Sequence, residues 1–183
     1  MHNLCHIILS RTCFNFKLIT LANQKIIDIF IRYIFLKGVT LTKVAKNVLD
    51  HIAIAVPEIE PVLKQYSELF GAEITLPKIV PEQGIRMAYV NFQNIKIELI
   101  EPLNEQSPIA KFLERNPKGA MHHFCAVTSD AEESAKLIRD NKIRVLSEPA
   151  EGHHGQKMFF MHPSDTSGIL IEVVEHKIEK DNK

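Results

Sequence analysis

Two stretches of the chain alternate apolar side chains with small or polar ones, and each contains a histidine. In residues 49–56, three branched apolar side chains fall on one face of a predicted strand, and His51 falls on the other face with two alanines. The pattern returns in residues 121–127, with His123 at the position of His51. The two histidines are 72 residues apart, which indicates an internal repeat.

A second repeated pattern places a glutamate inside an aliphatic strand. Glu98 lies in the predicted strand 95–100, and Glu172 lies 74 residues later in the predicted strand 169–174. Each half of the chain therefore offers a histidine on its first strand and a glutamate on its last. Two imidazoles and two carboxylates suit a divalent first-row metal ion. The candidate metal ligands are His51, Glu98, His123 and Glu172.

Each candidate ligand also has an ordinary structural interpretation. A histidine on a strand is more often hydrogen-bonded within the protein, and Glu98 shares its strand face with the solvent-seeking Lys96. Glu172 shares its face with Leu170 and Val174, so its carboxylate needs a partner, a proton or a metal ion. The recurrence of the whole set at nearly equal spacing favours the metal site.

The elements predicted around these strands follow the order β-α-β-β-β in each half. The first half predicts a helix over 57–70 with an apolar stripe reaching Leu69 and Phe70, then strands at 72–76, 85–92 and 95–100. The second half predicts a helix capped by Asp130, strands at 142–146, 157–162 and 169–174, and a loop at 148–156. The fold class is therefore α+β, with two tandem βαβββ modules.

The predicted domain covers residues 45–176. Module 1 spans about 47–102, a linker helix 107–116 begins after Ser107, and module 2 spans about 119–176. Residues 1–44 carry six lysines and arginines and one acid, and we expect an appendage outside the fold. The apolar run in this segment is interrupted by charges and too short to span a membrane. Residues 177–183 read as a charged tail.

Composition and charge narrow the partners and the compartment. The 183 residues are 45% apolar and carry a formal net charge of zero, so neither a nucleic acid nor a membrane surface is expected as a partner. Cys5, Cys13 and Cys125 are too widely spaced for a disulfide framework, which favours a reducing compartment. We expect the cytoplasm, with the mitochondrial matrix as the alternative if residues 1–44 act as a presequence.

The remaining histidines give weaker signals. Strand alternation predicts that His122 points away from His123 and is structural. His153 and His154 lie in a glycine-bounded loop and could contact a ligand. No phosphate-binding glycine loop, Ser-His-Asp order or zinc-ribbon spacing is found in the sequence.

Several segments, taken together and in order, resemble the methylmalonyl-CoA epimerase family. They are LDHIAIAV, PEQGIR, KIELIEPL, SPIAKFLERNPKGAMHHFC and GILIEV, and they cover about residues 47–175. This family belongs to the vicinal oxygen chelate superfamily, which also contains glyoxalase I. The resemblance implies a half-barrel fold, methylmalonyl-CoA as substrate and epimerisation at C2 through an enolate. The exposed edges of such half-barrels favour a homodimer.

The resemblance also implies roles for individual residues. The four candidate ligands take the metal positions, with Co²⁺ as the first choice and Mn²⁺, Zn²⁺ or Ni²⁺ as alternatives. Glu172 would also be the base on one face of C2. Some relatives have a second glutamate two residues after the position of Ile85, but this chain has Met87, which cannot move a proton. Glu82 is the replacement candidate, with Gln83 as a hydrogen-bond donor to the substrate.

Three other functions remain open for the same pattern. Glyoxalase I, a lyase, would use the same four ligand types. A metal-free protein of this fold could sequester a small molecule, although it would not need two histidines and two acids. An extradiol dioxygenase ranks last, because it needs a face of two histidines and one carboxylate and usually has a longer chain.

Overall fold

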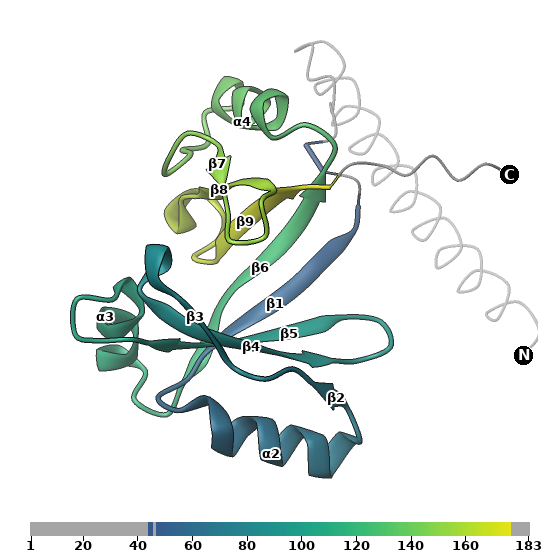
Figure 1. Ribbon diagram of the computed structural model, residues 1–183. Helices are drawn as coiled ribbons and strands as arrows, with labels where there is room; N and C mark the ends of the chain where they lie inside the picture. The colour runs from purple at the N-terminus through teal and green to yellow at the C-terminus, as the bar shows by residue number, and fades with distance from the viewer. Residues whose placement is uncertain (1–43, 46, 177–183) are drawn as a thin grey trace, which may run out of the picture. The chain divides into compact units, whose positions relative to one another are not determined.

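The computed structural model describes residues 44–45 and 47–176 of the chain (Figure 1). The chain divides into two units, Met1–Thr42 and Lys43–Lys183, and the described residues belong to the second. The predicted appendage, apart from Val44, and the predicted tail 177–183 lie outside the described residues. The domain and module bounds stated above stay predictions.

Nine strands form one mixed sheet in the described part of the chain (Figure 1). They are β1 (Leu49–Ala55), β2 (Glu73–Ile74), β3 (Lys78–Val80), β4 (Ile85–Asn91), β5 (Lys96–Pro102), β6 (Ala120–Thr128), β7 (Ala150–Glu151), β8 (Lys157–Met161) and β9 (Leu170–Glu175). The strand order is β2-β4-β5-β1-β6-β9-β8-β7, and β3 pairs with β4. The long strands β1 and β6 therefore lie side by side at the centre.

The helices begin where the sequence supplies capping side chains. They are α2 (Ile59–Phe70), α3 (Pro108–Arg115) and α4 (Ala131–Asp140), with 3-10 turns η1 (Pro81–Gln83) and η2 (Pro163–Asp165). The Ser107 hydroxyl accepts the N–H of Ile109 at the start of α3, and Asp130 accepts the N–H of Glu133 at the start of α4. Both predicted caps are confirmed. Among the described residues, no helix combines the length and apolar character that crossing a membrane requires.

The internal repeat is visible in the strand pairing. β5 runs parallel to β1, β9 runs parallel to β6, and β1 and β6 are antiparallel to each other. Glu98 lies opposite Ala53, and Glu172 lies opposite Cys125. In both modules the glutamate is thus level with the residue two positions beyond the histidine. The predicted α+β fold of two related modules is confirmed.

The two faces of module 1 are buried by different partners. On one face, Ile59 and Leu63 of α2 pack against Leu99 and neighbouring side chains of β4. On the other face, Met87 packs with alanines of β1, and Ile109 of α3 closes this cluster. Module 2 buries α4 against β8 and β9 in the same way. The face of the sheet opposite α2 therefore carries the side chains at positions 51, 87, 89 and 98.

Two details of the predicted elements are wrong. The end of the α2 stripe is not buried, because Leu69 and Phe70 are 66% and 60% exposed. Residues 142–146 do not form a strand; within them only Val145 makes an isolated bridge. The reason is local: Lys142 has a φ of 65°, and the N–H of Arg144 is donated to Asp165 instead of to a neighbouring strand. The short β7 forms later, inside the predicted loop.

Gly119 allows the chain to pass close to β1 before it enters β6. Its φ is +86°, and a Cβ at this position would lie 2.7 Å from the carbonyl oxygen of Ala55. We predict that Gly119→Ala lowers the free energy of unfolding by about 3 kcal/mol, because backbone strain and a clash are combined. Chemical denaturation of the purified variant measures this change.

Gly155→Ala is the matched control for this prediction. Gly155 has a φ of +77°, but an added Cβ would meet nothing within 4 Å. This variant should therefore show the strain without the clash and lose less stability than Gly119→Ala. Equal losses in the two variants would contradict a role for the close approach to Ala55.

Candidate metal centre

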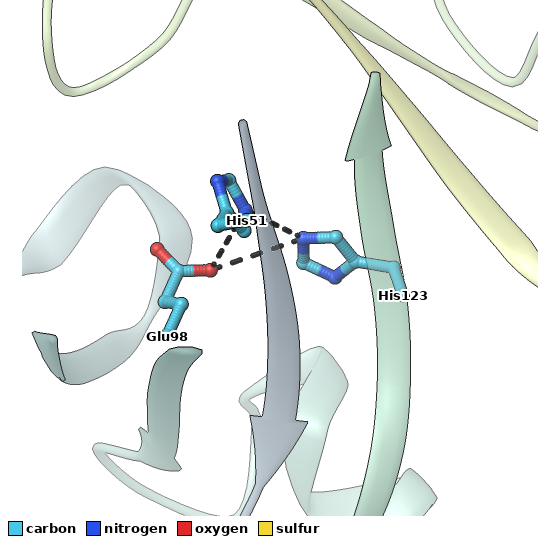
Figure 2. A group of neighbouring side chains, drawn as sticks. All are labelled: His51, Glu98 and His123. Carbon is cyan, nitrogen blue, oxygen red and sulfur yellow. Dashed lines mark hydrogen bonds and ion pairs between the residues drawn. The ribbon is translucent and has the colours of Figure 1, made fainter. Parts of the chain in front are cut away.

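Four side chains from four adjacent strands converge on one point. His51 of β1, Glu98 of β5 and His123 of β6 point toward one another in Figure 2, and Glu172 comes from the neighbouring strand β9. Alternation along each strand places these side chains on the same face of the sheet. The structure therefore brings together all four residues that the sequence pattern predicted as ligands.

The donor atoms are separated by distances typical of neighbouring ligands around one ion. The Nε2 atoms of His51 and His123 are 3.3 Å apart, and His51 Nε2 lies 3.4 Å from Glu98 Oε2. Glu172 Oε2 lies 2.9 Å from His123 Nε2 and 3.6 Å from His51 Nε2. Metal bonds of about 2.0–2.2 Å place adjacent donors ~3.0–3.4 Å apart. The cluster therefore has both the chemistry and the spacing to hold a divalent metal ion.

Burial makes this cluster strongly dependent on compensating charge. His51, Glu98 and His123 are 4–6% exposed. Burial raises the pKa of Glu98. Burial alone would lower the pKa of His51, but hydrogen bonds to Asp50 and Glu172 and the nearby carboxylate charges raise it to about 9. Two buried carboxylates beside two imidazoles favour a bound cation or proton.

Glu172 remains ionised in spite of its burial. Burial would raise its pKa, but hydrogen bonds to His123 and His51 and their charges lower it to about 2. An ionised carboxylate is able to accept a proton, whereas a protonated one is not. Glu172 therefore has the form required of both a metal ligand and a base.

Tyr89 and His154 lie beside Glu98 at the edge of the cluster. The Tyr89 hydroxyl donates to Glu98 Oε1 over 3.3 Å and lies 3.0 Å from His154 Nε2. Burial, followed by the charge of Glu98, raises the pKa of Tyr89, so this hydroxyl keeps its proton. The loop histidine is thereby connected to a metal-site carboxylate. The sequence gave no signal for Tyr89.

His122 does not point away from His123, so that expectation is wrong. Its Nδ1 atom lies 2.8 Å from Nδ1 of His123, and its ring meets Phe112 edge-on at 5.0 Å. Burial, together with the charge of His123, lowers the pKa of His122 to about 4, which keeps this imidazole neutral. The structure therefore places it behind a candidate ligand.

Asp50 is the residue at this site that the sequence reasoning missed. Its Oδ1 atom lies 2.9 Å from Nδ1 of His51. A signal was present, because a polar residue immediately precedes the candidate histidine in both repeats.

Cys125 lies close to the cluster as a neutral thiol. Its sulfur belongs to a group of possible ligand atoms, with atoms of His51 and Glu172, that lie within 4.8 Å of one another. Burial and the neighbouring carboxylate charges raise the pKa of Cys125. Cys125 therefore forms an uncharged wall of the site.

Glu82 and Gln83 are not part of this cluster. Both lie in the turn η1 before β4, where Glu82 is exposed and makes no hydrogen bond or ion pair with other described residues. Tyr89 is level with Glu98, and Ile85 lies four residues earlier, or about 13 Å along the strand. Met87, between these positions, is fully buried and carries no ionisable group.

Comparison with known proteins agrees with this geometry. A family model described as the Glyoxalase/Bleomycin resistance protein/Dioxygenase superfamily matches residues 50–160. The chain is 42% identical over 126 residues to "Methylmalonyl-CoA epimerase, mitochondrial" of Bos taurus, covering 68% of this chain and 72% of that protein.

Solved structures give the same result at the level of the fold. The methylmalonyl-CoA epimerase of Mycobacterium tuberculosis aligns with a TM-score of 0.68 at 28% identity, covering 79% of this chain and 97% of its own. A methylmalonyl-CoA epimerase in complex with methylmalonyl-CoA and NH4+ aligns with a TM-score of 0.65 at 32% identity. This second alignment covers 70% of this chain and 93% of that structure's chain.

Proposed function

The chain belongs to the methylmalonyl-CoA epimerases of the glyoxalase/bleomycin resistance protein/dioxygenase superfamily, and from this we propose that it interconverts the two C2 epimers of methylmalonyl-CoA. The structural observation that supports this function is the convergence of two imidazole and two carboxylate donors from both modules at one buried point. Glyoxalase I remains the alternative for such a donor set, but similarity to the epimerases disfavours it.

The proposed reaction is a proton removal followed by a proton return. The C2 proton lies between a thioester and a carboxylate, and its loss gives an enolate with negative charge on oxygen. A divalent ion held by His51, Glu98, His123 and Glu172 supplies positive charge that stabilises this oxygen as the charge develops. Inversion requires that the proton leaves one face of C2 and that a proton arrives on the other face.

We assign the first of these steps to Glu172 and the second to Glu82. Glu172 accepts the C2 proton and becomes the carboxylic acid, and the acid form of Glu82 donates a proton to the opposite face of C2. Exchange with water then restores both groups. Gln83 donates a hydrogen bond to the substrate. Glu82 is supported by its exposed position in the turn that leads into β4, which leaves its carboxylate accessible.

Proton exchange at C2 tests the proposed reaction directly. We expect deuterium to enter C2 of a single methylmalonyl-CoA epimer in D₂O, together with formation of the other epimer. Chelator treatment should abolish both, and added Co²⁺ should restore them more fully than Mn²⁺, Zn²⁺ or Ni²⁺. NMR and chiral analysis of the product measure the two quantities.

The other outcomes point to different functions. A protein that binds metal but exchanges no proton would exclude the epimerase, and lactoylglutathione formation would then be assayed. A protein that binds methylmalonyl-CoA without metal and without exchange would be a sequestering protein.

We also propose a homodimer as the assembled form. Several large apolar side chains are exposed around the end of α2 and the β2–β3 segment, and such a surface favours burial against a partner. They are Leu69, Phe70, Ile74, Leu76 and Ile79. We keep the cytoplasm as the proposed compartment. The word mitochondrial in the name of the bovine relative supports the matrix as the alternative.

A further inference from the structure

The ladder between β1 and β6 has a register shift immediately before the first ligand histidine. Leu49 pairs with Ala126, whereas His51 pairs with Cys125. Two steps along β1 therefore correspond to one step along β6. Asp50 is the extra residue, which makes this position a β-bulge.

A second shift, on the opposite strand, lies immediately before the second ligand histidine. Ala53 pairs with His123, whereas Ile54 pairs with Met121. Here two steps along β6 correspond to one step along β1, and His122 is the extra residue. The repeat thus has an extra residue before the ligand histidine in each module, at positions 72 residues apart.

These extra residues have side chains directed at the histidines that follow them. In a regular strand, successive side chains point to opposite faces, so neither contact would form. A bulge re-aims the side chain of the extra residue. Asp50 Oδ1 lies 2.9 Å from His51 Nδ1, and His122 Nδ1 lies 2.8 Å from His123 Nδ1.

We propose that Asp50 and His122 are positioning residues that hold the two ligand histidines by their Nδ1–H groups, an inference that rests on the proposed metal-dependent function. A histidine with its hydrogen on Nδ1 presents the lone pair of Nε2. In both His51 and His123, Nε2 is the atom directed into the cluster. Acceptors on Nδ1 fix both the tautomer and the ring orientation, and they increase the basicity of the ligand nitrogen.

The two positioning residues differ in strength. Asp50 carries a negative charge, and it is itself held by Lys96 Nζ at 2.8 Å and by His176 Nε2 at 3.2 Å. His122 is an imidazole that packs against the ring of Phe112. Hydrogen bonds to a charged acceptor are roughly twice as strong as those to a neutral one. The first module should therefore hold its histidine more firmly than the second.

Metal affinity measures this role without relying on catalysis. The full-length protein and its variants are titrated with Co²⁺ in competition with a chromophoric chelator. We expect Asp50→Ala to weaken Co²⁺ binding by about 10–100-fold and His122→Phe by about tenfold, because each removes one acceptor. Asp50→Asn, which keeps an acceptor but loses the charge, should lie between Asp50→Ala and the unmodified protein. The visible absorption of bound Co²⁺ should change in the Asp50 variants.

Thermal unfolding in excess chelator separates positioning from a general structural role. Asp165→Asn is the matched control, because Asp165 is ion-paired with Arg144 outside the site, and its Co²⁺ affinity should not change. If Asp50→Ala fails to fold, Asp50→Asn carries the same test. Unchanged Co²⁺ affinity in the folded Asp50 and His122 variants would overturn the proposal, even if their melting temperatures in chelator fall. An unmodified protein that binds no Co²⁺ would also overturn it, while proton exchange at C2 would still decide the epimerase function separately.

Discussion

Glu172→Gln is expected to lower epimerisation by about 10²–10⁴-fold, which is the usual contribution of a positioned base. Glutamine keeps an oxygen at the position of Glu172 Oε2, next to His123 Nε2, but cannot accept the C2 proton. The metal should therefore still bind, although more weakly, while proton transfer on one face stops. Epimerisation rate and metal content, measured on the same preparation, distinguish these two effects.

The two epimers of the substrate give this prediction a sharper form. With Glu172 replaced, deuterium should no longer enter the epimer whose C2 proton faces Glu172. The other epimer should still exchange, with its configuration retained, because the base on its side remains. Equal loss of exchange from both epimers at full metal occupancy would contradict the role of Glu172 as a base on one face.

Glu82→Gln is the matched variant, and it should show the mirror-image result. Exchange should be lost from the other epimer, and metal affinity should not change, since Glu82 lies outside the ligand cluster. Normal epimerisation by Glu82→Gln would remove Glu82 from the mechanism. The second proton transfer would then be sought at Tyr89 and His154, which lie beside Glu98.

His123→Ala is expected to reduce metal affinity by more than about 100-fold and to remove measurable epimerisation. His123 Nε2 lies 2.9 Å from Glu172 Oε2 and 3.3 Å from His51 Nε2, so its loss opens the centre of the donor set. It also leaves buried carboxylates without a nearby imidazole, which is unfavourable. Metal analysis after dialysis and proton exchange in D₂O measure the two losses.

His162→Ala is a suitable control for this variant. His162 lies at the start of η2, where its Nδ1 accepts the N–H of Ser164. It makes no printed contact with the four candidate ligands, so metal content should not change. Retention of one metal ion with normal affinity by His123→Ala would contradict the proposed ligand set.

The sequence by itself determined the repeat and the identity of the four residues that converge. Alternation along a strand is a local property, so His51 and Glu172 could be assigned to faces from their neighbours alone. The equal spacing of the histidines and glutamates then implied that the two modules present them in the same way. Local capping signals were equally reliable, as Ser107 and Asp130 show.

Only the tertiary structure decided what surrounds these residues. The contacts of Asp50 and His122 depend on register shifts between β1 and β6, and such shifts are set by pairing between distant strands. The strand expected at 142–146 failed because Asp165, more than 20 residues away, accepts the N–H of Arg144. Tyr89 reaches Glu98 only because β4 and β5 pair in one particular register. Local periodicity contains the face of each side chain but not its partner across the sheet, and the partner is what controls the chemistry of the site.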